Sequence, residues 1–262
     1  MNVQSSPARL RGWSDAEWQV RCDLAALYRL CAHHRWTDSI FTHISARVPG
    51  PEHHFLLNRF GQMHHEVRAS DLVKIDIDGN PVEEADPRAS DPDAQLVNKA
   101  GFVIHSAVHM AREDAHFVIH THTPAGIAVS SQKQGLLPLS QQALKYYGHL
   151  AYHGYEGIAL DEDERVRLVA DLGTHDAMLL RNHGILVCGA TASFAYDELY
   201  ALERACAAQV ATLAGGCELI LPPKEVCERT AAQFRSPMIR KSCDKQWEAA
   251  LRLIEGGVDY RS

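Results

Sequence analysis

The sequence predicts an α/β fold built around one core. Hydrophobic residues make up 46% of the 262 positions, which is enough apolar surface for a sizeable buried interior. Some segments repeat apolar residues at helical spacing, and others alternate apolar with polar residues and end in turn signals. We find no internal repeat, low-complexity tract or linker that would divide the chain, so a single domain is expected.

Helical segments are marked by capping residues and by apolar spacing. Ser14 and Glu17 form the pattern of a capping box, and apolar residues then recur at helical spacing through about Trp36. Pro124 occupies a first-turn position, which favours a helix start. The remaining expected helices cover 103–112, 124–131, 161–172 and 191–213, with Pro222-Pro223 opening a helical C-terminal segment whose last helix covers 245–255.

Strands are expected where short apolar runs end in turns. Residues 40–48 and 55–57 read as antiparallel strands around Pro49-Gly50-Pro51, and 72–77 alternates up to the hairpin signal Asp78-Gly79. A hairpin is expected over 177–188, short strands and loops over 136–155, and a surface loop over 83–92. The organisation we expect is a flexible leader (1–13), a domain (14–215) and a helical extension packed on that domain (216–262).

Charge and cysteine usage restrict the partners. The net charge is −7 and no basic block stands out, which argues against nucleic acid or an anionic membrane as partner and leaves small molecules. The apolar stretches are too short for a membrane span, and the N-terminus lacks a secretory core. Seven scattered cysteines without C-x-x-C spacing, three of them (Cys22, Cys31 and Cys206) expected as buried thiols, fit a reducing cytoplasm.

The most informative motif is His120-Thr121-His122 at the end of an apolar run. Side chains alternate along a strand, so the two imidazoles project from one face. His183 lies in a tight turn between two further apolar runs. Three neutral histidines with an open coordination position suit a catalytic divalent metal, although a chain with 16 histidines also produces such a pair by chance.

The remaining histidines receive separate interpretations. His105 and His109 share one helical face; His105 is the candidate proton donor or base, and His109 is expected to be structural. The adjacent pairs have neither strand nor helical spacing, and we interpret them as surface or loop residues: His33-His34, His53-His54 and His64-His65.

The chain resembles the class II aldolase/adducin family, and its adducin-like branch in particular. The matching segments are Gly101-Phe102-Val103-Ile104-His105-Ser106, Val118-Ile119-His120-Thr121-His122-Thr123-Pro124, Gly135-Leu136-Leu137-Pro138, Leu180-Arg181-Asn182-His183-Gly184 and Leu57-Asn58-Arg59-Phe60-Gly61, within roughly residues 15–215. The resemblance implies a three-layer α/β/α fold with a central, mostly antiparallel sheet. It also implies a homotetramer with active sites at subunit interfaces, and a divalent metal on His120, His122 and His183. Zinc is the first expectation, with manganese, cobalt or iron as alternatives.

Departures from the sugar-phosphate aldolases narrow the chemistry. Those enzymes carry Ser-Ser-Glu where this chain has Lys99, Ala100 and Gly101, so the acid/base carboxylate and both phosphate-binding hydroxyls are missing. Their phosphate-binding Asn falls near His43. A sugar phosphate is therefore a poor fit. The expected catalytic residues are His105 and Tyr152, and the expected substrate-binding residues are His43, Asn58, Gly61 and Lys99.

The tyrosine-rich segment 146–155 includes Tyr152. In related enzymes this segment runs near a neighbouring subunit's site, which implies a catalytic role for Tyr152; interface packing is the alternative role for these tyrosines.

Together these features predict a metal-dependent carbon–carbon lyase, by aldol-type cleavage or decarboxylation, acting on a small hydroxy-, oxo- or hydroxyaromatic carboxylate. Decarboxylation needs no base for a hydroxyl proton, so the missing carboxylate favours it modestly. The alternatives are a non-catalytic adducin-like interaction module and a non-haem iron oxygenase on the same scaffold.

Overall fold

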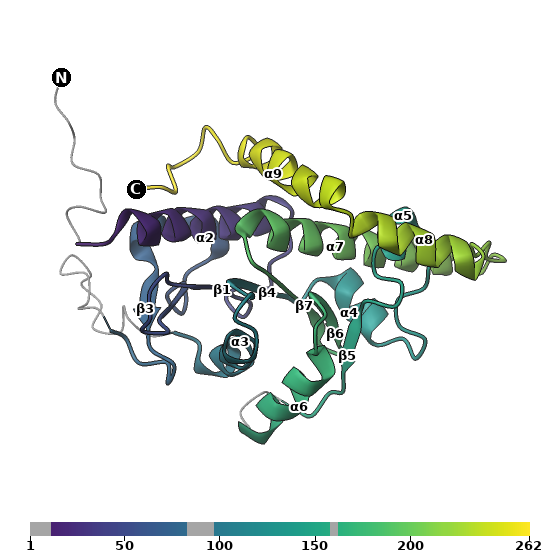
Figure 1. The fold of residues 1–262 in the computed structure, drawn as a ribbon, viewed down its shortest axis with the longest axis horizontal. Helices are drawn as coiled ribbons and strands as arrows, with labels where there is room; N and C mark the ends of the chain where they lie inside the picture. Colours follow the sequence, from purple (N-terminus) through teal and green to yellow (C-terminus); the bar gives the residue numbers. More distant parts are fainter. Residues whose placement is uncertain (1–11, 83–96, 158–161) are drawn as a thin grey trace.

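The computed structural model describes residues 12–82, 97–157 and 162–262 and shows a seven-stranded sheet with helices on both faces (Figure 1). The strand order is β3-β2-β1-β4-β7-β6-β5, and every neighbouring pair is antiparallel except β5 with β6. The strands are β1 (Ile44–Arg47), β2 (Phe55–Leu57), β3 (Val73–Ile75), β4 (Phe117–Thr121), β5 (Ala151–His153), β6 (Ala177–Leu180) and β7 (Gly184–Gly189). The predicted three-layer α/β/α fold with a mostly antiparallel sheet is confirmed.

Two layers of helices cover the sheet. Helices α2 and α7 pack on one face, α3 and α6 lie on the other, and α9 lies on the outer side of α7 (Figure 1). The α-helices are α2 (Asp15–His33), α3 (Lys99–Ala111), α4 (Pro124–Ser130), α5 (Gln141–Leu144), α6 (Glu162–Leu172), α7 (Ala192–Ala214), α8 (Lys224–Phe234) and α9 (Pro237–Leu251), and two short 3-10 turns are η1 (His64–Glu66) and η2 (Ala69–Asp71).

Strand alternation decides which side chains reach which layer. In β4, Phe117 and Ile119 belong to the apolar cluster under α2 and α7, while Val118 belongs to the cluster under α3 and α6. His120 has the parity of Val118 and therefore points to the α3 side of the sheet. In β1, Ile44 belongs to the α2–α7 cluster, which sends its neighbours His43 and Ser45 to that same α3 side.

The ends of three helices differ from the sequence prediction. Helix α3 begins at Lys99, four positions before the predicted start at Val103. Helix α2 ends at His33, because Arg35 adopts a positive φ of 60° that a helix does not contain. Ser14 caps its start, but the Glu17 carboxylate accepts from Arg21 and Lys74 and does not complete a capping box. The Arg21 contact lies within α2, and the Lys74 contact ties α2 to β3.

Helix α9 begins at Pro237, eight positions before the predicted start at Lys245. The Ser236 hydroxyl accepts from the Ile239 amide, and proline suits the first turn. This Ser-Pro signal accounts for the earlier start.

Several expectations concern segments outside the described residues, namely most of the leader 1–13 and the whole of the loop 83–92. Within the part of the chain that is described, no helix is both long and apolar enough to cross a bilayer. Cys22, Cys31 and Cys206 are buried free thiols, as expected. Burial raises the pKa of Cys22 to about 11, so this thiol is protonated near neutral pH.

Candidate functional site

Three histidine side chains meet at the end of strand β4. His120 lies within the strand, His122 follows its last residue, and His183 lies in the turn between β6 and β7. The Nε2 atom of His122 is 2.8 Å from Nε2 of His120 and 3.0 Å from Nε2 of His183. One ring nitrogen of each residue lies within 4.8 Å of the others. The structure therefore brings together the three histidines that the strand and hairpin patterns indicated.

The β6–β7 hairpin fixes the place of His183. Its backbone amide donates to the Leu180 carbonyl at 3.0 Å, and Asn182 takes a positive φ of 58°, which asparagine tolerates better than most residues. Gly184 lies against the Thr121 carbonyl so closely that a Cβ at this position would clash with backbone. The absence of a side chain at Gly184 thus permits β7 to approach β4 beside the histidines.

Hydrogen bonds at the far ring edges set the tautomers of two rings. His120 Nδ1 lies 2.8 Å from the Ile185 carbonyl oxygen, and His122 Nδ1 lies 3.0 Å from a carboxylate oxygen of Asp38. Both oxygens act as acceptors, so in each neutral ring Nδ1 carries the proton and Nε2 keeps a lone pair. When both rings are neutral, two lone pairs point at each other across 2.8 Å, an arrangement that a cation stabilises.

The site favours neutral imidazoles, the form that binds a metal. Burial lowers the pKa of His120 well below its usual range, with repulsion from His183 and His122 adding to it. Burial, then repulsion from His122, lowers the pKa of His183 to about 4. A tetrahedral ion at roughly 2.0–2.1 Å from each nitrogen separates the nitrogens by about 3.3–3.4 Å. The separations of 2.8 and 3.0 Å need to widen by about 0.3–0.6 Å, so the donor set fits a divalent metal such as zinc.

A cleft of about 520 Å³ opens over the three histidines. Its rim carries three aromatic side chains, Phe41, Phe60 and Tyr155, which are 55%, 49% and 56% exposed. Its other lining residues are Asp38, His43, Asn98, Ile104, His120, His122, Ile127, Gly157, Asn182 and His183. None of these described lining residues is a lysine or an arginine. The described lining therefore offers aromatic surface and imidazoles, and it contains no lysine or arginine that could hold a phosphate.

Two expected residues lie at the floor of the cleft. His43 lines it, and the His43 ring packs within 6.4 Å of the His120 ring, centroid to centroid. His105 is fully buried behind His43, with ring centroids 4.4 Å apart. Burial lowers the pKa of His105 well below its usual range, so this residue is a neutral imidazole.

The structure does not bring the other expected residues into the cleft of the same chain. The Tyr152 hydroxyl accepts from the Leu136 amide at 3.1 Å, and Tyr155 instead contacts His183. The buried Asn58 accepts from the Tyr28 hydroxyl at 2.8 Å. Gly61 lies in an exposed turn beside Phe60, and the Lys99 side chain lies outside what is described. Their proposed roles stay predictions.

One histidine interpretation is wrong and one important residue went unnoticed. His64 is buried, 4% exposed, and its ring lies 4.8 Å from the Tyr28 ring, although the pair His64-His65 reads as surface or loop. Glu203 of α7 accepts hydrogen bonds from Thr121 and Thr123, the neighbours of His122. A glutamate eighty residues away gives no sequence signal for this contact.

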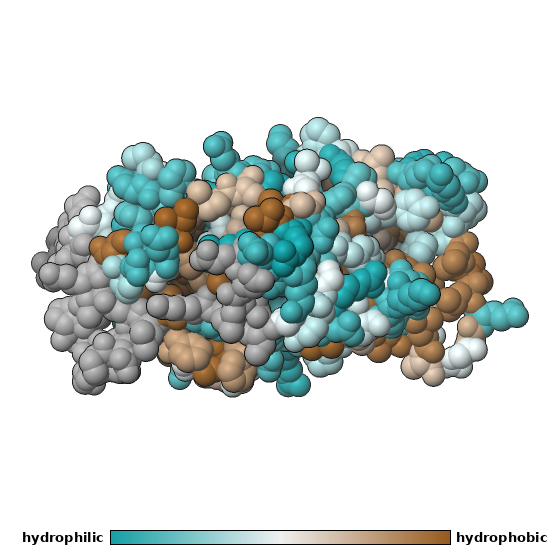
Figure 2. All heavy atoms as spheres, turned by 90° about the horizontal axis from the view of Figure 1, so that it is seen from below, coloured by the Kyte–Doolittle hydropathy of each residue, from teal (hydrophilic) through white to brown (hydrophobic). Residues whose placement is uncertain are grey.

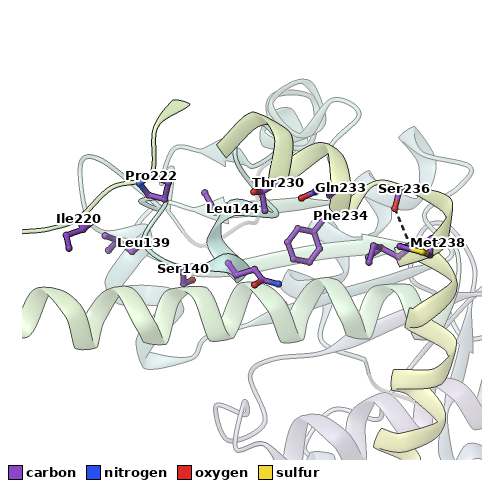
Figure 3. Close-up of a pocket in the computed structure, with 12 residues that line it drawn as sticks. Leu139, Ser140, Leu144, Ile220, Pro222, Thr230, Gln233, Phe234, Ser236 and Met238 are labelled. Carbon is purple, nitrogen blue, oxygen red and sulfur yellow. Dashed lines mark hydrogen bonds between the residues drawn. The ribbon is translucent and has the colours of Figure 1, made fainter. Parts of the chain in front are cut away.

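A second cavity, of about 620 Å³, lies far from the histidines between α5, α8 and the start of α9 (Figure 3). Its lining is apolar or uncharged, with Leu144 on one side and Phe234 on the other. Figure 2 shows apolar surface gathered at the same end of the molecule, where the segment before α8 exposes 94% of Ile220. Without a titratable side chain in its lining, this cavity is no candidate for catalysis.

Comparison with known proteins agrees with the fold and identifies the family. The family described as "Class II Aldolase and Adducin N-terminal domain" matches residues 22–210, and the chain belongs to this family. A relative from Caulobacter vibrioides, named only as a candidate class 2 aldolase, is 54% identical over 215 residues, 82% of this chain and 80% of that protein. Rat alpha-adducin is 42% identical over 95% of this chain, which spans 35% of the adducin.

Two solved structures carry the same fold. The aldolase II superfamily protein from Pseudomonas syringae has a TM-score of 0.88 and 50% identity, covering 98% of this chain and 100% of that chain. The L-fuculose 1-phosphate aldolase from Glaciozyma antarctica has a TM-score of 0.80 and 25% identity, covering 94% of this chain and 93% of its own.

Proposed function

We propose that this protein is a metal-dependent carbon–carbon lyase whose divalent ion, zinc first, is held by His120, His122 and His183. The observation that carries the proposal is the convergence of three ring nitrogens, with Nε2 of His122 at 2.8 Å from Nε2 of His120 and 3.0 Å from Nε2 of His183. The Ile185 carbonyl and the Asp38 carboxylate accept from Nδ1 of His120 and His122, which leaves Nε2 of each neutral ring free to bind a metal. Membership of a family that includes aldolases supports the same reading.

The residues around the ion would have separate roles in the reaction. A bound dication would supply Lewis-acid stabilisation of the negative charge that develops when a carbon–carbon bond breaks, typically several kcal/mol. Asp38 and the Ile185 carbonyl orient the ligand rings from outside. His43 at the floor would contact the substrate, and His105 behind it is the proposed acid/base group in place of the carboxylate missing at Gly101.

The cleft supports a small carboxylate with an aromatic or apolar substituent as substrate. Two neighbouring oxygens, as in a hydroxy-, oxo- or ortho-hydroxyaromatic acid, would chelate the ion. The rim residues Phe41, Phe60 and Tyr155 offer rings on which such a substituent would pack. The name of the Glaciozyma relative gives a sugar phosphate as its substrate. The described lining of the cleft has no lysine or arginine to bind such a phosphate. Lys99 is the proposed partner of the substrate carboxylate.

The family and the composition support a proposal for the oligomeric state and the cellular location. We propose a homotetramer in the cytoplasm, with Tyr152, and the loop containing Asn58 and Gly61, serving sites formed at subunit interfaces. Residues 14–215 would form the catalytic domain, with 216–262 as its helical extension.

The test combines metal content with turnover. Wild-type protein, His183→Ala and the matched control His116→Ala, an exposed histidine preceding the same strand, are stripped and reloaded with zinc, manganese or cobalt. We expect one ion per chain in wild type and control and a large loss in His183→Ala. Loaded protein is then incubated with hydroxyaromatic, 2-hydroxy and 2-oxo acids while aldehyde and CO2 release are followed. Unchanged metal content in His183→Ala contradicts the site.

A second candidate function is a non-catalytic module of the adducin type. It is favoured by one observation, the 42% identity to rat alpha-adducin over 95% of the chain, which exceeds the 25% identity to the fuculose phosphate aldolase. Failure of the purified protein to retain zinc, manganese, cobalt or iron after reloading would support this candidate over the lyase.

A further inference from the structure

A chain of hydrogen bonds links strand β1 to helix α3 behind the cleft. The Ser45 hydroxyl oxygen lies 2.6 Å from His105 Nδ1 and 2.7 Å from His109 Nε2. At the far end, His109 Nδ1 lies 2.7 Å from the Ala115 carbonyl oxygen. Ser45, His105 and His109 are each 0% exposed, so bulk water does not compete for these bonds.

The position of each proton follows from the carbonyl at the far end. A carbonyl only accepts, so His109 Nδ1 carries a proton. Burial lowers the pKa of His109 to about 3, with the nearby Arg47 adding to the effect, so the ring is neutral and its Nε2 is a bare acceptor. The single proton of Ser45 therefore goes to His109. The Ser45 oxygen then accepts from His105, which places the His105 proton on Nδ1.

His105 Nε2 is consequently left with a lone pair. This atom is buried and has no hydrogen-bond partner among the residues that the structure describes. Its ring lies against His43, which lines the cleft. We propose that Ser45 and His109 are positioning residues that hold His105 in the Nδ1–H tautomer, making His105 a fixed hydrogen-bond acceptor beneath His43.

The direction of the chain limits what His105 does. A group that reaches Nε2 must bring its own O–H or N–H, so His105 in its resting state accepts a proton and does not donate one from this atom. Resting on the proposed function, a hydrogen-bond acceptor behind the cleft suits aldol cleavage, in which a substrate hydroxyl loses its proton. It does not suit the proton donor that decarboxylation requires.

Nitrogen NMR of the histidine rings tests the inference without metal or substrate. Long-range 1H–15N spectra of metal-free protein with 15N-labelled histidine distinguish protonated from bare ring nitrogens, and the signals are assigned with His105→Asn and His109→Asn. We expect both rings of the wild type to carry the proton on Nδ1. A His105 ring protonated on Nε2 overturns the proposal, whatever the variants do.

Two serine variants test the positioning role. In Ser45→Ala, His105 loses the acceptor for its Nδ1–H and should populate the Nε2–H form, while His109 keeps its tautomer through Ala115. Ser106→Ala is the matched control, because Ser106 is also buried beside His105 but bonds to the Val103 carbonyl of its own helix. An unchanged His105 in Ser45→Ala, or a change in Ser106→Ala, contradicts the assignment.

Metal content separates this inference from the proposed function. Ser45→Ala should bind the same amount of zinc as wild type, since neither positioning residue touches the three proposed ligands. Protein that binds none of zinc, manganese, cobalt and iron but shows the expected tautomers would refute the lyase and leave the hydrogen-bond chain standing.

Discussion

Lowering the pH should reduce the free energy of unfolding, in part because of His64. The substitution His64→Leu should remove the part of the reduction that His64 causes. The His64 ring packs on Tyr28 and is 4% exposed. Burial, with repulsion from His43 and His65 adding to it, lowers the pKa of His64 to about 4. In the unfolded chain the pKa returns to about 6.5. Stability that is fully present above pH 6.5 is therefore lost as the pH falls, because the unfolded chain takes up a proton that the folded chain refuses.

The size of the effect follows from these two pKa values. Between pH 7 and pH 5 the unfolded imidazole becomes almost fully protonated while the folded one stays neutral. The difference in protons bound by the unfolded and folded chains, integrated over this interval, is about 1.4 pH units. At about 1.4 kcal/mol per unit, His64 should lower the free energy of unfolding by roughly 2 kcal/mol. Other groups titrate as well, but they are present in both proteins and cancel when wild type and variant are compared.

Urea unfolding of the metal-free proteins at pH 7 and pH 5 measures this difference. The loss of unfolding free energy between the two pH values should be roughly 2 kcal/mol smaller in His64→Leu than in wild type. His65→Leu is the matched control, because His65 is the exposed neighbour and contributes less than burial to the lowered pKa of His64, so its loss should stay close to that of wild type. An equal loss in wild type and His64→Leu would refute the burial argument.

Three further changes test the surroundings of the proposed ligands. Burial raises the pKa of Glu203 to about 7, so its stability contribution is fully present below about pH 4.5 and is lost as the pH rises through 7. The free energy of unfolding of wild type should therefore fall between pH 5 and pH 8 by roughly 2–3 kcal/mol more than that of Glu203→Gln, as measured by urea unfolding. Asp38→Asn should lower zinc affinity roughly 10–100-fold in a chelator competition, since the amide no longer holds the His122 proton as a carboxylate does; unchanged affinity would contradict that role. Gly184→Ala should cost at least roughly 1–3 kcal/mol and weaken zinc binding, because its Cβ meets the Thr121 carbonyl; a variant as stable as wild type would refute the close approach.

Strand periodicity explains why much of the fold and the histidine cluster is predictable. The spacing of His120 and His122 requires one face as soon as the strand is recognised, and the hairpin signals around His183 fix its turn. The β4–β7 register, with Thr121 opposite Ile185, then brings that turn beside the pair. Family resemblance supplied the layer order, which periodicity alone does not give.

Residues whose roles depend on tertiary contacts escaped the sequence reasoning. His64 looks like half of a surface pair, and only the packing of α2 shows that Tyr28 covers it. Asp38 and Glu203 act through partners 84 and 82 or 80 residues away, and a lone carboxylate carries no local pattern that indicates them. Hydrogen-bond partners at such separations are set by how the elements pack, which capping and spacing rules do not describe.

X-ray absorption spectroscopy of the zinc-loaded protein tests the central claim most directly. The account predicts a first shell of three imidazole nitrogens at roughly 2.0–2.1 Å with oxygen completing it, and the loss of one imidazole in His183→Ala. Spectra showing fewer than three imidazoles in the wild type, or the same shell in His183→Ala, would contradict the three-histidine site and the lyase proposed from it.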